Sequence, residues 1–161
     1  MRLIWLVGPP GAGKTTFVRN HTIPSVEFNH MLQPLTAPWN LERGVLHANG
    51  HLIKAIRSIC QQPKSPLPSE LIVVAGCVKE EDLFPLHEGE EVWLMLPESK
   101  RWIRQLSNRP DSFDGIPQHS NLTFATEMYD VYHELGNRLD LKIVDSKYRP
   151  SLIGCVPEQD D

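Results

Sequence analysis

The feature that most constrains this chain is a glycine-rich segment near its start. Residues 8–15 read Gly-Pro-Pro-Gly-Ala-Gly-Lys-Thr and match the pattern G-x-x-x-x-G-K-S/T at every fixed position. The apolar residues 2–7 come before it, and a segment able to form a helix, residues 14–20, follows it. Glycines let such a segment wrap around an anion with several backbone N–H groups pointing inward. The pattern therefore predicts a loop that binds the phosphates of a nucleoside triphosphate.

Each residue of this loop is a candidate nucleotide ligand. The set consists of Gly8, Pro9, Pro10, Gly11, Ala12, Gly13, Lys14, Thr15 and Thr16. Lys14 has the length and charge to reach the β- and γ-phosphates, and the Thr15 hydroxyl is placed to bind Mg²⁺. The start of the following helix adds a dipole that favours negative charge. We therefore expect the cofactors to be ATP and Mg²⁺.

Beyond the loop, apolar strand patterns alternate with helical ones. Strands are expected over residues 2–7, 26–28, 71–75, 91–96 and 141–145. Apolar residues at spacings of three and four predict helices over residues 41–60, 97–108 and 122–139, with Gly136 as a C-terminal cap. Residues 109–120 are expected to form a polar loop. This alternation predicts an α/β domain with a five-stranded parallel sheet covered on both faces.

Composition limits what such a domain can do. The 161 residues suit one domain, and 40% hydrophobic with 22% charged residues excludes general disorder. A net charge of −4 gives no basic field to hold nucleic acid by counterion release alone. Three separated cysteines favour a reducing compartment, and no segment approaches the roughly 20 apolar residues of a membrane span. We expect a soluble, cytoplasmic domain over residues 1–156 and a frayed acidic tail over residues 157–161.

With these motifs, the chain resembles the small P-loop kinases, a group that includes shikimate, gluconate, nucleoside and polynucleotide kinases. It lacks the N-K-x-D and D-x-x-G patterns of GTPases, and its length leaves no room for the helical lid domain of AAA-type motors. Residues 71–77, Leu-Ile-Val-Val-Ala-Gly-Cys, are similar to the third strand of shikimate and gluconate kinases, whose end faces the acceptor. The resemblance implies a three-layer P-loop NTPase fold and transfer of the γ-phosphoryl group of ATP to a hydroxyl group.

The same resemblance implies a lid at about residues 104–120. Residues 92–98, followed by Arg101, Arg104 and Arg109, are similar to the strand–helix–lid segment of these kinases, whose lid arginines clamp the phosphoryl group. Guanidinium groups suit this role because that group carries spread negative charge. Arg104 and Arg109 are therefore candidate catalytic residues. Arg149 follows the last strand, where these kinases pack a loop against adenine.

The chain departs from the kinase pattern at two acids. Many of these kinases have an Asp soon after the second strand as catalytic base, and here Glu27 is the only carboxylate in that stretch. Glu27 is a candidate catalytic residue, as base or as holder of a Mg²⁺-bound water, and the alternative is a surface residue. The third strand also ends without an acid, so Mg²⁺ would rely on Thr15, the phosphates and water. Both departures leave open an ATP-binding switch module that has no acceptor.

The acceptor itself follows only from a more specific resemblance. Residues 44–51 and 73–78 are similar to small phage kinases, some of which phosphorylate 5-hydroxymethyluracil in phage DNA. This resemblance implies hydroxymethylated DNA as the partner and, for a phage protein, the host cytoplasm as its location. The acidic net charge favours a free nucleoside or another small metabolite instead. Both acceptors stay open at this point.

Two histidines have a spacing of interest on the predicted helix 41–60. His47 and His51 are four residues apart, a spacing that can bind a metal ion. No carboxylate or cysteine completes such a site in the sequence. The sequence alone therefore favours two solvated histidines.

Overall fold

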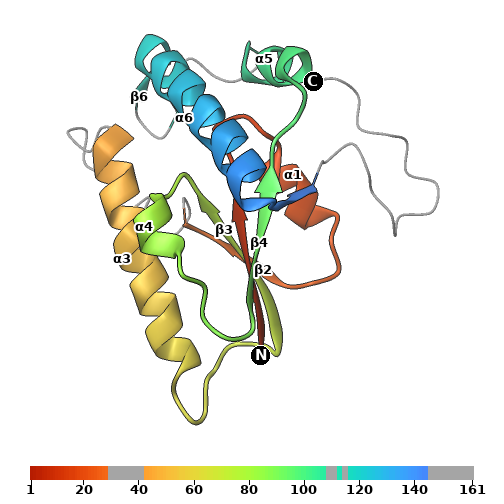
Figure 1. Cartoon of the computed structure of the whole chain (residues 1–161), viewed down its shortest axis with the longest axis vertical. Helices are drawn as coiled ribbons and strands as arrows, with labels where there is room; N and C mark the ends of the chain where they lie inside the picture. Colours follow the sequence, from red (N-terminus) through yellow and green to blue (C-terminus); the bar gives the residue numbers. More distant parts are fainter. Residues whose placement is uncertain (29–41, 108–111, 114–115, 145–161) are drawn as a thin grey trace.

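The computed structural model describes residues 1–28, 42–107, 112–113 and 116–144. Five parallel strands form one sheet in the order β2-β3-β1-β4-β7 (Figure 1). The strands of this sheet are β1 (Arg2–Val7), β2 (Ser25–Glu27), β3 (Glu70–Gly76), β4 (Glu90–Met95) and β7 (Lys142–Val144). The helices are α1 (Lys14–Arg19), α3 (Glu42–Cys60), α4 (Glu80–Leu83), α5 (Ser99–Ser107) and α6 (Gln118–Leu139). The predicted α/β fold with five parallel strands is confirmed.

The central position of β1 explains its composition. It pairs in parallel with β3 on one side and with β4 on the other. Residues 3–7 are all buried, which an apolar run without polar alternation predicts for a strand covered on both faces. All five strands have their carboxyl ends at the same edge of the sheet. Because β1 is the central strand, the glycine-rich loop that follows it lies at the middle of this edge.

Helices cover both faces of the sheet and give it three layers. Trp5 and Val7 of β1 share one core with residues of α3, α4 and α6, which include Ile53, Leu83 and Tyr132. The alternate side chains of β1 point to the other face, where they pack with Val18 of α1. Figure 1 shows α1 and α3 on opposite sides of the sheet. Among the described residues, no helix combines the length and the apolar character needed to cross a membrane.

Residues 109–120 differ from the predicted polar loop. They contain a short antiparallel pair, β5 (Ser112–Phe113) and β6 (Ile116–Pro117), and α6 already begins at Gln118. The predicted lid, residues 104–120, therefore begins within the last turn of α5 and ends within the first turn of α6. Strands of two residues are too short to show a periodic apolar pattern, so they could not be predicted from the sequence.

Gly136 does not cap α6, so that prediction is wrong. The helix continues to Leu139, and Asp140 takes the left-handed conformation with φ +51°. The Leu141 N–H donates to the Gly136 carbonyl at 3.2 Å, the bond expected when Asp140 is the residue after the cap. A Cβ on Gly136 would lie 2.8 Å from a methyl carbon of Leu94. Gly136 is therefore needed for the close packing of α6 on β4.

The amino ends of the strands carry an ionic cluster. Arg57 of α3 binds Glu90 at 2.7 and 3.0 Å, and the Trp5 indole N–H donates to the same carboxylate at 2.9 Å. The side chains of Arg57 and Glu90 are 12% and 5% exposed. Burial opposes ionisation of Glu90, but the hydrogen bonds from Arg57 and Trp5 outweigh it, so its pKa lies below its ordinary value. Arg2 similarly binds Glu70 and Glu91.

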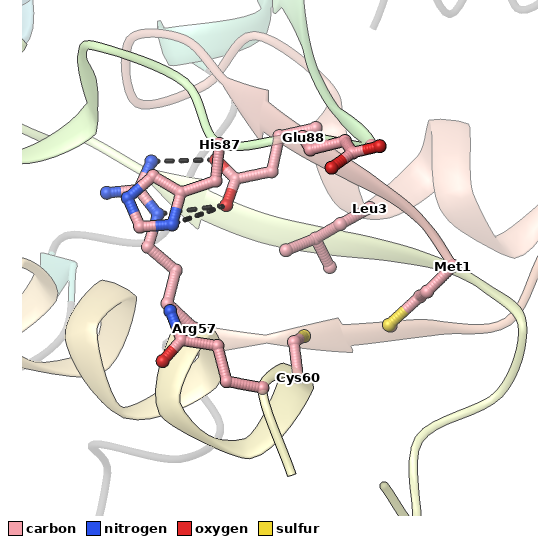
Figure 2. A pocket seen from close by; sticks show the side chains of 9 residues that line it. Met1, Leu3, Arg57, Cys60, His87 and Glu88 are labelled. Atoms are coloured by element: carbon pink, nitrogen blue, oxygen red, sulfur yellow. Dashed lines mark hydrogen bonds and ion pairs between the residues drawn. The ribbon is translucent and has the colours of Figure 1, made fainter. Parts of the chain in front are cut away.

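Figure 2 shows the pocket beside this cluster. It has a volume of about 460 Å³ and is lined by the chain start, the end of α3 and the turn before β4. Cys60 is in its wall, and burial raises the pKa of that thiol. Glu90 is contacted from two sides, since His87 also lies 4.0 Å from it. We therefore assign this end of the sheet to stability.

Candidate functional site

The glycine-rich loop connects β1 to α1 at the carboxyl edge of the sheet. Gly13 has φ +96°, a conformation that residues with a side chain rarely adopt. At Gly8, a Cβ would lie 2.3 Å from the Met95 carbonyl oxygen, so only glycine lets the loop start this close to β4. Local geometry thus explains two glycines of the motif: Gly13 is needed for its left-handed turn, and Gly8 for the close approach to Met95.

Lys14 folds back over this loop. Its ammonium donates to the carbonyl oxygens of Gly8 and Pro9, both at 2.8 Å. The Phe17 N–H donates to the Gly13 carbonyl at 3.0 Å and continues α1 directly from the loop. The Lys14 ammonium is therefore held beside the loop, where it would contact an anion bound by the loop.

Glu27 reaches the same place from another strand. Its carboxylate accepts a hydrogen bond from the Thr15 hydroxyl at 2.6 Å. The next residue, Phe28, is buried and packs edge-on against Trp5, which fixes the end of β2. A hydroxyl and a carboxylate side by side supply the hard oxygen ligands that Mg²⁺ prefers. The donor set at this point therefore fits the predicted magnesium ion.

The end of β3 is held by two side chains from helices. The Asn49 amide donates to the carbonyls of Ala75 and Cys77 at 3.1 and 2.7 Å. The Tyr132 hydroxyl donates to the Gly76 carbonyl at 3.0 Å and accepts from the Val78 N–H at 2.9 Å. Burial raises the pKa of Tyr132 well above its ordinary value, so the hydroxyl stays protonated for both bonds.

This strand end is joined to the phosphate loop. The Gly8 N–H donates to the Gly76 carbonyl at 3.2 Å, and the Cys77 thiol lies 3.7 Å from the Gly8 carbonyl that also accepts from Lys14. Helices α3 and α6 thus position the loop through β3. The sequence shows only an Asn and a Tyr on apolar helix faces, which is a weak signal for such a role.

Helix α5 lies against the other side of the loop (Figure 1). The buried Trp102 indole donates to the Pro10 carbonyl at 2.8 Å, and Leu106 would meet a Cβ on Gly11 at 3.1 Å. The Trp102 ring packs on Tyr129 of α6, with ring centroids 4.5 Å apart. A tryptophan in an amphipathic helix is usually core, so its contact with the loop could not be read from the sequence.

The remaining predicted site residues are only partly placed. Pro9 and Pro10 are buried, and Thr16 is half-buried on the first turn of α1. Arg104 lies on α5 with its side chain exposed, whereas Arg109 and Arg149 lie outside the described residues. The structure therefore brings together the loop, Thr15 and Glu27. Across the part of the chain that is described, no three His, Cys, Asp or Glu side chains form a metal-binding group.

Comparisons with known proteins show what the chain is similar to. No protein-family model and no curated protein sequence matches it. Among solved structures, shikimate kinase from Acinetobacter baumannii in complex with shikimate matches with a TM-score of 0.60 and 16% identity, over 92% of this chain and 85% of that one. Shikimate kinase from Bacteroides thetaiotaomicron matches with a TM-score of 0.54 and 15% identity, over 89% and 86%. A sugar kinase from Janibacter matches with a TM-score of 0.52 and 14% identity, over 90% and 84%.

These matches extend over about nine tenths of the chain. The three-layer P-loop fold that the sequence predicts, in the form found in small kinases, is therefore confirmed. At these identities the likeness is one of fold.

Proposed function

We propose that this protein is an ATP-dependent phosphotransferase that transfers the γ-phosphoryl group to a hydroxyl acceptor. The observation that carries the proposal is the pairing of Thr15 with Glu27 beside a complete phosphate loop. A glycine-rich turn without nucleotide chemistry has no need of a carboxylate from a different strand at this point. The kinase fold of the structural neighbours supports the same reaction class.

The loop and Lys14 bind the triphosphate in this proposal. Lys14 exchanges the carbonyls of Gly8 and Pro9 for phosphate oxygens, and so neutralises negative charge. Arg104 and Arg109 close over the transferring group, and Arg149 lies against adenine. Closure of such a lid keeps water away from the phosphoryl group and favours the acceptor over hydrolysis.

Thr15 and Glu27 hold magnesium in this proposal. Mg²⁺ would offset the negative charge that develops on the phosphoryl group during transfer. Thr15 would supply an oxygen ligand, and Glu27, whose carboxylate contacts the Thr15 hydroxyl, would orient a water on the metal. The alternative role for Glu27 is general base for the acceptor hydroxyl, and the two roles differ in their dependence on Mg²⁺ concentration.

For the acceptor we put forward 5-hydroxymethyluracil in DNA, with a free nucleoside or another small metabolite as the alternative. The first rests on the resemblance of residues 44–51 and 73–78 to phage kinases. The second is favoured by the net charge of −4 and by the small-molecule acceptors named for the structural neighbours.

The test is transfer of label from γ-labelled ATP to a panel of acceptors. The panel contains nucleosides, nucleotides, sugars, shikimate, plain DNA and DNA with 5-hydroxymethyluracil, and Lys14→Ala is the control. Label on hydroxymethylated DNA alone supports DNA as the acceptor. Label on a small molecule supports the kinase proposal but contradicts DNA as its acceptor. Tight ATP binding with no labelled acceptor contradicts the kinase and favours a switch module.

A further inference from the structure

Two histidines on α3 lie together, away from the phosphate loop. The Nε2 atoms of His47 and His51 are 3.1 Å apart, and both side chains are exposed. Their ring centroids are 4.6 Å apart and the ring planes meet at 89°. The two residues are one turn apart on a helix of 19 residues, so the backbone between them is regular.

This separation has a specific chemical meaning. Zinc binds histidine nitrogen at about 2.0–2.1 Å, so an ion at that distance from both Nε2 atoms would subtend an angle of about 100°. That angle lies between the values for square-planar and tetrahedral coordination. The same nitrogens now share a hydrogen bond, in which one imidazole donates and the other accepts. The N–H of one ring and the lone pair of the other therefore point at each other. A shift of the donor's proton to its Nδ1 would leave two Nε2 lone pairs beside the same small space.

We propose that His47 and His51 form a binding site for a divalent transition-metal ion, with water in the remaining coordination positions. Imidazole nitrogen suits Zn²⁺, Ni²⁺ and Cu²⁺, whereas Mg²⁺ prefers oxygen ligands. The site is therefore distinct in chemistry from the magnesium site at Thr15. The sequence interpretation of two solvated histidines considered only the missing third ligand, and two preorganised imidazoles with open positions do not require one.

The site has a structural consequence because of Asn49. Asn49 lies between the two histidines in sequence and about 200° around the helix from each of them, on the side that faces the sheet. There it holds the carbonyls of Ala75 and Cys77 at the end of β3. An ion that bridges His47 and His51 closes the helical turn that carries Asn49. Since the unfolded chain lacks this geometry, the ion stabilises the folded state.

The test is titration of the untagged full-length chain with NiCl₂ and ZnCl₂, followed by calorimetry and thermal unfolding. We expect one tightly bound ion per chain and a higher Tm, weaker binding of Mn²⁺, and none of Mg²⁺ at this site. His47→Gln and His51→Gln should each lower the Ni²⁺ affinity by at least about tenfold, the lower end of what even an outer-shell change costs. His133→Gln is the matched control and should bind like the wild type, because His133 is exposed on α6 and has no histidine three or four residues away.

A rescue variant separates spacing from histidine content. Ala55 is exposed and lies four residues after His51, so Ala55→His in the His47→Gln background rebuilds the same pair one turn further along. We expect restored Ni²⁺ affinity in this double variant. Unchanged affinity in His47→Gln, or failed rescue in a double variant with wild-type circular dichroism, would overturn the proposal. Lys14→Ala should bind Ni²⁺ normally while it loses ATP, so the metal site is judged independently of the proposed kinase activity.

Discussion

The amino and carboxyl ends of the parallel strands form two edges of the sheet, and a basic residue has different contacts at each. At the amino edge, Arg57 forms an ion pair with Glu90, which also accepts a hydrogen bond from the Trp5 indole, so these two charges have partners of opposite sign. At the carboxyl edge, Lys14 is bound to neutral backbone carbonyls of its own loop. Open α/β sheets bind ligands at the carboxyl ends of their strands. Together with the phosphate-loop motif, this comparison assigns ligand binding to the carboxyl edge and stabilisation of the fold to the amino edge.

The largest effect should come from breaking the amino edge. Arg57→Ala leaves the Glu90 carboxylate buried without its cation and removes donors to the carbonyls of Asp82 and Leu83. Loss of one partner of a buried pair costs about 3–5 kcal/mol. We expect the free energy of unfolding in urea to fall by this amount. ATP affinity of the folded fraction at low temperature should not change, and a loss of affinity there would show that the two edges are coupled.

The matching change at the carboxyl edge is Lys14→Ala. Removal of one preorganised charge-stabilising donor typically lowers the rate by about 10²–10³-fold. We expect a loss of that size in kcat/KM for phosphoryl transfer. The free energy of unfolding should fall by only about 1–3 kcal/mol, less than in Arg57→Ala, because two hydrogen bonds to loop carbonyls are lost. The measurements are transfer kinetics and urea unfolding on the same samples. A large loss of stability with activity retained would reverse the comparison.

A smaller effect is expected at the contact between α5 and the loop. Trp102→Phe keeps an aromatic ring on Tyr129 but removes the indole donor to the Pro10 carbonyl. A hydrogen bond of this kind contributes about 1 kcal/mol, which corresponds to roughly a fivefold change. We expect KM for ATP to rise by that factor with kcat little changed. Tyr129→Phe, which loses only the bond to the Pro97 carbonyl, is the control and should leave KM unchanged.

The smallest effect is a pH dependence at the amino edge. Glu90 has a folded-state pKa below its ordinary value of 4.5 because of Arg57 and Trp5. Its stabilising contribution is therefore complete above about pH 4.5 and is lost as the pH falls through the folded-state pKa. The difference in unfolding free energy between the wild type and Glu90→Gln should shrink below pH 4.5. A difference that stays constant down to pH 3 would contradict the assignment.

Local patterns predicted the elements that depend on local physics. The glycines that the phosphate loop needs are close together in the sequence, so the loop could be predicted. Strands β1 and β3 could be predicted because their central residues are continuous apolar runs. Glu27 could be proposed as a candidate from its place after the second strand. Its contact with Thr15 could not, because it joins β2 to α1 across a sheet in which β3 lies between β2 and β1.

One wrong prediction and two contacts that were not predicted depended on partners distant in the sequence. Gly136 looked like a cap because its neighbour Leu94 belongs to another element. Asn49 and Trp102 bind backbone carbonyls that are 26 and 92 residues away in sequence, and a carbonyl leaves no mark in a sequence pattern. The contact between His47 and His51 could not be predicted for a different reason. Their spacing of four residues predicts that they are neighbours, but it does not predict the orientation of the two rings.

The most direct test of ATP and Mg²⁺ binding at the phosphate loop and Glu27 is the affinity of a non-hydrolysable ATP analogue, measured by calorimetry with and without Mg²⁺. Wild type and Glu27→Gln are compared on the same buffers, since Gln keeps the size of the side chain and removes its charge. We expect Mg²⁺ to strengthen analogue binding in the wild type and Glu27→Gln to reduce this gain in affinity. No binding by the wild type, or an equal gain from Mg²⁺ in both proteins, would contradict it.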